Sequence, residues 1–136
     1  MKIVVLAVGR VKQPFADDVQ HYRKLLGGLA RVEVVEVRDD EQVARRIPER
    51  AFVTLLDVGG DVMDSVAFSR WMEQRRMEGR DVWFVIGGAF GGVELDRVDH
   101  RLSFGPMTLP HQLARVVLLE QVYRAHKILA NEPYHY

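Results

Sequence analysis

The sequence lacks cysteine entirely, and it also lacks any hydrophobic stretch long enough to cross a membrane. The absence of cysteine excludes disulfides, thiolate nucleophiles and metal centres with cysteine ligands. The apolar residues 3–8 fall far short of the roughly 20 that a membrane-spanning helix needs. They also lack the small-residue cleavage pattern of a signal peptide. We therefore expect a cytoplasmic protein with no membrane partner.

The chain also has no excess of charge of either sign. Its 19 basic and 19 acidic residues give a formal net charge of zero. This speaks against a large basic face for nucleic acid, although a local basic patch remains compatible with it. Composition is that of an ordinary globular protein, with 48% hydrophobic and 28% charged residues. A length of 136 residues predicts a single domain over residues 1–136.

Apolar segments typical of strands alternate with helical patterns, which favours an α/β fold with a mostly parallel sheet flanked by helices. Strands are predicted at residues 2–8, 32–37, 51–56, 82–86 and 101–104. Helices are predicted from Pro14 to Gly27, after Asp39 until Pro48, from Asp64 or Ser65 to Gly79, near 94–98, and from Pro110 to about Ala130.

The last predicted helix is apolar on most sides over residues 113–119, apart from Arg115. A helix of this kind must be covered on most sides, either by a second copy of the chain or by its own core. The pattern supports both alternatives equally. A buried guanidinium also needs a partner. Arg115 is expected to pair with a carboxylate such as Glu120, or to face a ligand or a partner molecule.

Three polar or glycine-rich segments follow predicted strands. They are residues 57–60, 87–92 and 103–110. Ligands in α/β proteins bind beyond the carboxyl ends of parallel strands, so these segments are expected to converge on one crevice. The glycines of 87–92 permit close approach of backbone to a ligand, or simply form a tight turn. Thr108 lines the crevice, caps the following helix, or does both.

The final residues, 131–136, are rich in aromatic and titratable groups. Tyr134 has the chemistry to stack on a nucleobase, and His135 has the chemistry of a base near neutral pH. The alternative is an ordered aromatic terminus that packs on the surface.

These segments resemble the RlmH family of SPOUT-class RNA methyltransferases over nearly the whole chain. The resemblance is densest in the residues Leu102-Ser103-Phe104, in Met107-Thr108-Leu109-Pro110-His111-Gln112, in residues 115–125, and in Pro133-Tyr134-His135. It also includes the opening residues 2–9, Leu56-Asp57 and residues 84–88.

The resemblance implies a SPOUT fold with a C-terminal trefoil knot, and a homodimer. It implies that S-adenosylmethionine binds in the knot, that no metal takes part, and that the substrate is a pseudouridine of 23S rRNA in the assembled ribosome, methylated at N3. Carried over by position, the cofactor contacts are Leu56, Gly87, Phe104, Gly105, Pro106, Met107, Thr108 and Leu109.

The resemblance also gives the tail a part in catalysis. N3 of pseudouridine carries a proton that must leave before methylation, so a base is required. His135 is the expected base, and Tyr134 positions the nucleobase or stacks on it. Arg115, with Arg124 and Lys127, is expected to contact phosphates or to stabilise the developing anion.

The chain departs from the family pattern in three places: residues 38–50 are fewer than usual, Asn131 stands where glycine is common, and Tyr136 stands where a basic residue often follows the histidine. Two other functions fit the sequence less well. One is a SPOUT-like dimer that binds RNA or a nucleotide without catalysis, which the zero net charge favours. The other is an α/β dimer that serves as an interaction module.

Overall fold

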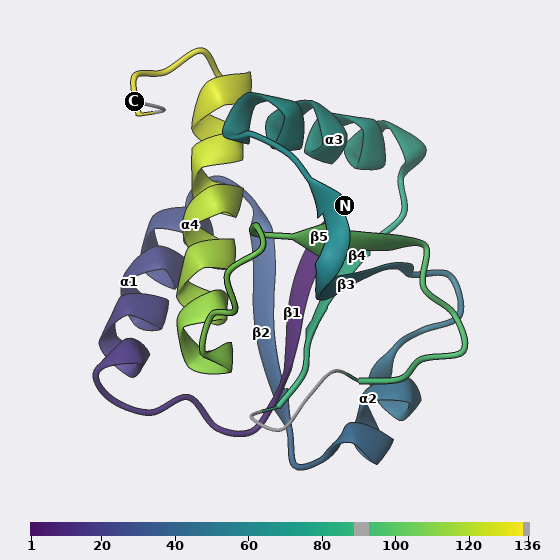
Figure 1. Ribbon diagram of the computed structural model, residues 1–136. Coiled ribbons are helices and arrows are strands. Elements are labelled where there is room, and N and C mark those ends of the chain that lie inside the picture. The colour runs from purple at the N-terminus through teal and green to yellow at the C-terminus, as the bar shows by residue number, and fades with distance from the viewer. Residues whose placement is uncertain (89–92, 135–136) are drawn as a thin grey trace.

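A single sheet of five parallel strands forms the centre of the computed structural model, which describes residues 1–88 and 93–134 (Figure 1). The spatial order of the strands is β2-β1-β4-β3-β5. They span β1 Lys2–Val8, β2 Arg31–Val37, β3 Phe52–Val62, β4 Val82–Ile86 and β5 His100–Ser103. The helices are α1 Phe15–Gly27, α2 Asp40–Arg46, α3 Ser65–Glu78 and α4 His111–Leu129. The predicted α/β class is confirmed, and the trefoil knot stays a prediction.

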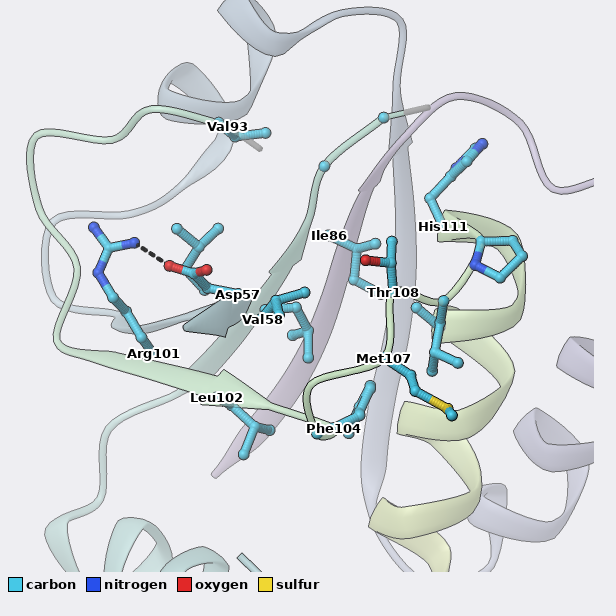
Figure 2. A pocket seen from close by; sticks show the side chains of 18 of the residues that line it. Asp57, Val58, Ile86, Val93, Arg101, Leu102, Phe104, Met107, Thr108 and His111 are labelled. Atoms are coloured by element: carbon cyan, nitrogen blue, oxygen red, sulfur yellow. Dashed lines mark hydrogen bonds and ion pairs between the residues drawn. The ribbon is translucent and has the colours of Figure 1, made fainter. Parts of the chain in front are cut away.

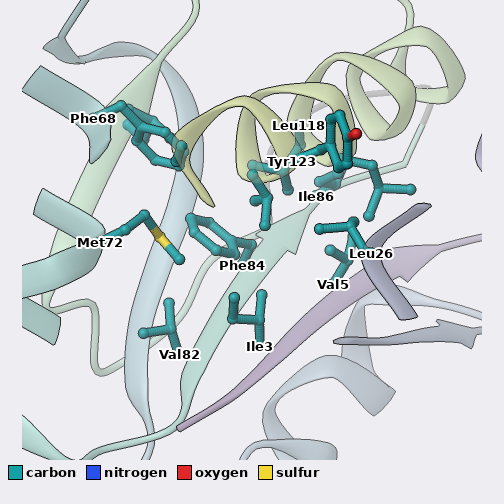
Figure 3. Close-up of a cluster of buried hydrophobic side chains, with 14 of the residues drawn as sticks. Ile3, Val5, Leu26, Phe68, Met72, Val82, Phe84, Ile86, Leu118 and Tyr123 are labelled. Atoms are coloured by element: carbon teal, nitrogen blue, oxygen red, sulfur yellow. The ribbon is translucent and has the colours of Figure 1, made fainter. Parts of the chain in front are cut away.

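Alternating side chains of the strands supply two hydrophobic clusters, one on each face of the sheet. In β1, Ile3 and Val5 point to one face, whereas Val4 and Leu6 point to the other. Helices α1, α3 and α4 cover the first face, where Phe84 of β4 lies near the middle of the cluster (Figure 3). Helix α2 and the segment after residue 92 cover the second face.

The ends of α2 and α3 follow the expected capping chemistry. The Asp39 carboxylate accepts a hydrogen bond from the backbone N–H of Gln42 at the start of α2. The Asp64 carboxylate accepts one from Ala67 N–H at 2.7 Å, which settles the predicted start of α3. Helix α3 ends at Gly79, whose φ of 76° is left-handed and favours glycine.

The predicted helical stretch near residues 94–98 is wrong, because this segment is irregular. Long-range contacts hold it instead of helical hydrogen bonds. The Arg97 guanidinium donates to the backbone carbonyls of Pro48 and Glu49. The backbone N–H of Asp99 donates to Val53 at 2.9 Å, and the Asp99 carboxylate accepts from Val53 N–H at 2.8 Å. These contacts lay the segment along the edge of the second cluster.

Helix α4 is central to the fold on one side and partly open on the other. Leu118, Leu119 and Val122 are fully buried in the first cluster, so its own core covers that side. Leu113 and Val117 are only half-buried. Coverage of this second side by another copy of the chain stays a prediction. Neither α4 nor any other helix of the described residues has the combined length and apolar character to cross a membrane.

Candidate functional site

A cavity of about 930 Å³ opens beyond the carboxyl ends of β3 and β4, beside the start of α4 (Figure 2). This volume lies within the range of roughly 300 to 1,000 Å³ that is typical of small-molecule sites. The residues around it come from four separate parts of the chain: Leu55, Leu56, Asp57, Val58, Ile86, Gly87, Gly88, Val93, Glu94, Arg101, Leu102, Phe104, Gly105, Met107, Thr108, Leu109, Pro110, His111 and Ala114.

The predicted convergence of strand-end segments is confirmed for the described residues. Of the eight predicted cofactor contacts, all but Pro106 line the cavity. Residues 89–92 of the predicted glycine loop lie outside the described residues. That these lining residues bind a cofactor stays a prediction. The fold nevertheless brings them to one place, as the carboxyl ends of parallel strands require.

One wall of the cavity is an irregularity within β3 and not the loop that was predicted at residues 57–60. Strand β3 continues to Val62, and its pairing with β5 shifts between Leu56 and Asp61. The residues between them bulge out of the ladder. Gly60 permits this, because a Cβ there would lie 2.6 Å from the carbonyl carbon of Arg101. Only glycine fits so close to a neighbouring backbone.

An ion pair between Asp57 and Arg101 lies at one end of the cavity (Figure 2). Arg101 Nη1 donates to Asp57 Oδ2 at 2.8 Å, and Asp57 Oδ1 accepts from the backbone N–H of Gly59 at 3.0 Å. The Gly59 hydrogen bond and then the Arg101 hydrogen bond lower the pKa of Asp57. The carboxylate therefore stays ionised at neutral pH. Sequence reasoning missed Arg101, because nothing local in the sequence places β5 beside β3.

The opposite wall is the connection between β5 and α4. Ser103 Oγ accepts the backbone N–H of Gly105 at 3.0 Å and donates to its carbonyl at 3.1 Å. Gly105 has a φ of 115°, which favours glycine. Thr108 lines the cavity but does not cap α4, because the residue before the helix is Pro110 and no side chain caps it. Met107 is 81% exposed at the rim.

Arg115 lies behind the cavity, with 1% of its surface exposed. Its Nη1 donates to Glu36 Oε2 at 2.9 Å, and its Nη2 donates to the carbonyl of Val8 at 3.0 Å. The expectation of a carboxylate partner is confirmed, but Glu120 is the wrong residue. Glu120 lies one turn before Arg124 on the same helix and pairs with it.

His111 connects this buried pair to the cavity. Arg115 Nη2 lies 3.5 Å from His111 Nδ1, and His111 itself lines the cavity. An arginine can only donate, so His111 Nδ1 is the acceptor. Burial lowers the pKa of His111, and the positive charges of Arg115 and Lys12 lower it further. The imidazole is therefore neutral at pH 7 and carries its proton on Nε2.

Of the two predicted catalytic residues of the tail, His135 lies outside the described residues. Tyr134 is not in the cavity lining; its ring packs edge-on against Tyr123, with centroids 4.8 Å apart. Arg124 Nη1 donates to the Tyr134 carbonyl at 3.2 Å, and its guanidinium lies 5.1 Å from the Tyr134 ring. Burial raises the pKa of Tyr134.

The start of the tail is fixed by a left-handed residue. Asn131 has a φ of 56° and follows the last turn of α4. Its N–H donates to the carbonyl of Ile128 at 3.0 Å, and Glu132 N–H donates to Lys127 at 2.9 Å. Asparagine tolerates this conformation better than other residues with a Cβ. The conformation explains why a glycine would also suit the position.

A metal site is not evident in residues 1–88 and 93–134, where no group of three or more His, Asp or Glu side chains could hold an ion. A small organic molecule is the ligand that the cavity fits best. Leucine, methionine and phenylalanine side chains form apolar walls for a flat ring. Open backbone at Gly87, together with the Asp57–Arg101 pair, supplies polar groups.

Comparisons with known proteins give a matching family and several similar proteins. The family described as "Predicted SPOUT methyltransferase" matches residues 1–135. The chain is similar to proteins named ribosomal RNA large subunit methyltransferase H. It is 37% identical to that of Gemmatimonas aurantiaca over 153 aligned residues and 36% identical to that of Carboxydothermus hydrogenoformans over 158. Each alignment covers 99% of both chains. Both alignments are longer than this chain, which agrees with the expected shortening of a segment.

Proposed function

The chain belongs to the SPOUT methyltransferase family, and from this premise we propose that it methylates N3 of a pseudouridine in 23S rRNA of the assembled ribosome, with S-adenosylmethionine as methyl donor. The observation that carries the proposal is the cavity of about 930 Å³, whose walls include seven of the eight predicted cofactor contacts. The names of the relatives, which are ribosomal RNA large subunit methyltransferases, support the choice of substrate. A ribosomal substrate also implies action in the cytoplasm.

The residues present suit such a cofactor. Leu56 and Leu109 offer apolar surface to an adenine ring, while Gly87 leaves backbone groups accessible to its polar edge. When bound, the cofactor supplies a methyl group already activated on a sulfonium. The protein has no need to activate the donor further. Its remaining tasks are to align the acceptor nitrogen and to remove the proton from it.

We assign removal of that proton to His135 and positioning of the nucleobase to Tyr134. A neutral imidazole has a pKa suited to accept a proton near pH 7. For Arg115 we favour a positioning role over direct contact with RNA, because its guanidinium is buried and already bonded to Glu36 and Val8. Through His111, it sets the shape and charge of one end of the cavity.

Tyr134 and the cavity of one chain lie far apart, which supports a homodimer. Tyr134 packs on Tyr123, and His111 lines the cavity. Tyr123 and His111, which both lie on α4, are separated by about 18 Å along the helix axis. A tail that acts at a cavity would then belong to the second copy. The half-buried side of α4 offers an apolar surface for that copy.

Calorimetric titration with S-adenosylmethionine tests the cofactor, and methyl transfer to ribosomes that lack the modification tests the reaction. We expect binding at submillimolar ligand and transfer to the assembled large subunit. A His135→Ala variant is expected to bind the cofactor normally and to lose transfer. A matched His21→Ala variant, altered at an exposed histidine of α1, is expected to retain both.

Each alternative outcome has a distinct meaning. Absence of cofactor binding would refute the methyltransferase proposal. Binding of cofactor and ribosomes without transfer would favour a binding dimer without catalysis. An undiminished rate in His135→Ala would remove His135 as the base.

A further inference from the structure

The charged side chains around the cavity are few, and two of them form an ion pair at one end. Among the described lining residues, the charged side chains are those of Asp57, Glu94 and Arg101, and Arg101 is the permanent cation of the set. Figure 2 shows Asp57 and Arg101 directed toward each other, across the cavity from Thr108 and His111. The rest of the lining is largely apolar or backbone. The cavity thus has one strongly polar end.

The ion pair at this end is open to a ligand. The Arg101 side chain is 52% exposed and that of Asp57 is 37% exposed. Arg101 has five N–H donors, and its contacts with described side chains engage Nη1 alone. Asp57 accepts from Gly59 and Arg101, which leaves further lone pairs on its two oxygens. Both residues can therefore bind a ligand without breaking their own contact.

The pair is also held in place by backbone. Asp57 is fixed by the Gly59 N–H within the β3 bulge, and Gly60 of the same bulge lies directly against the backbone of Arg101. The carboxylate and the guanidinium therefore sit on two adjoining strands whose separation is set by the fold. Prior positioning of this kind lowers the entropic cost of binding a charged group.

An adjacent cation and anion are the complement of a free amino-acid group, which carries a carboxylate and an ammonium on one carbon. A guanidinium binds a carboxylate through two parallel hydrogen bonds, and a carboxylate binds an ammonium. We infer that Arg101 binds the α-carboxylate, and Asp57 the α-ammonium, of the methionine part of S-adenosylmethionine. This inference rests on the proposed function, and it assigns the amino-acid end of the ligand to the polar end of the cavity.

Decarboxylated S-adenosylmethionine isolates the contribution of Arg101, because it keeps the sulfonium and the ammonium but lacks the carboxylate. The wild-type protein is expected to bind the intact cofactor at least about tenfold more tightly than the decarboxylated one, as loss of a charge-assisted hydrogen bond implies. Arg101→Gln is expected to weaken binding of the intact cofactor by about tenfold and to leave the decarboxylated one nearly unchanged.

Asp57→Asn provides the complementary variant. Both ligands carry the ammonium, so this change is expected to weaken both by similar factors and to preserve the preference for the intact cofactor. Arg76→Gln is the matched control, since Arg76 also forms a partly exposed ion pair, with Glu73 on α3, but does not line the cavity. We expect it to bind both ligands as the wild type does. Calorimetry measures all affinities, and urea unfolding confirms that each variant is folded.

The results separate this inference from the proposed function. Failure of the wild type to bind S-adenosylmethionine would refute the proposed function itself. Normal binding by the wild type, with Arg101→Gln weakening both ligands equally, would overturn the inference alone. Unchanged cofactor affinity in Arg101→Gln, combined with poorer use of ribosomes, would overturn it as well and assign Arg101 to the RNA.

Discussion

Among single residues, Arg115 imposes the strictest requirement on its surroundings. Its guanidinium is buried at the junction of β1, β2 and α4, where Glu36 and the Val8 carbonyl accept its hydrogen bonds. Glu36 Oε2 also accepts the backbone N–H of Val11 at 2.6 Å. One carboxylate thus compensates a buried charge and fixes the chain between β1 and α1.

Removal of this carboxylate is expected to destabilise the protein. Glu36→Ala leaves a buried guanidinium without its counter-ion, and we expect a loss of about 2 to 3 kcal/mol in the free energy of unfolding. Adding Arg115→Met to this variant removes the stranded charge and is expected to restore part of the stability. Urea denaturation measures both effects.

The control for this prediction lies on the same strand. Glu33 also forms an ion pair, in which its Oε2 lies 3.7 Å from Lys2 Nζ, but this pair is exposed to solvent. Glu33→Ala is therefore expected to change stability by less than about 0.5 kcal/mol. A double variant less stable than Glu36→Ala alone would contradict this account of the pair.

The partner of Arg115 also shows what local sequence can reveal about a residue. A guanidinium in an apolar helix predicts a carboxylate partner, and that prediction is confirmed. The choice of Glu120 was wrong, because spacing along one helix reveals only neighbours one turn away. Glu36 lies on strand β2, 79 positions earlier, and only the tertiary fold brings it close.

At the scale of elements, β3 is the strand that shapes the cavity. The Gly59-Gly60 pair predicted a turn after Leu56, whereas the strand resumes its pairing with β5 at Asp61. Glycines mark turns and bulges alike, so the sequence alone does not distinguish them. Regular strands and capped helices were predictable from periodicity and capping residues. The segment 94–98 was not, because contacts with distant carbonyls determine its path.

The bulge can be tested with two adjacent glycines. In Gly60→Ala the new Cβ would lie 2.6 Å from backbone of Arg101, so β3 and β5 must separate. We expect a loss of about 1 to 3 kcal/mol in stability, together with weaker binding of S-adenosylmethionine. In Gly59→Ala the nearest atom is Asp57 Oδ1 at 3.7 Å, an ordinary contact, so little change is expected. Similar behaviour of the two variants in urea denaturation and calorimetry would contradict the close approach of Gly60 to the backbone of Arg101.

For the molecule as a whole, we propose that a second copy of the chain covers the outer side of α4. If a second copy does, a charge placed there must weaken the association. Val117→Glu is expected to raise the dimer dissociation constant by at least about tenfold, because an unpaired carboxylate would be buried. Met77→Glu, on α3, is the control, since Met77 is 74% exposed.

Sedimentation velocity over a range of concentrations measures this difference. We expect the wild type and Met77→Glu to sediment as dimers, and Val117→Glu to dissociate on dilution. A monomeric wild type, or a Val117→Glu variant as tightly associated as the wild type, would refute the proposed dimer.

The late position of α4 in the chain has a consequence for biosynthesis. Strands β1 and β4 emerge long before the residues that cover them, since Leu118, Leu119 and Val122 follow near the end. A nascent chain that stops short of α4 therefore exposes the part of the apolar sheet face that α4 covers, the kind of surface that chaperones bind. The cavity, whose last wall reaches Ala114, likewise forms only after the start of α4 has left the ribosome.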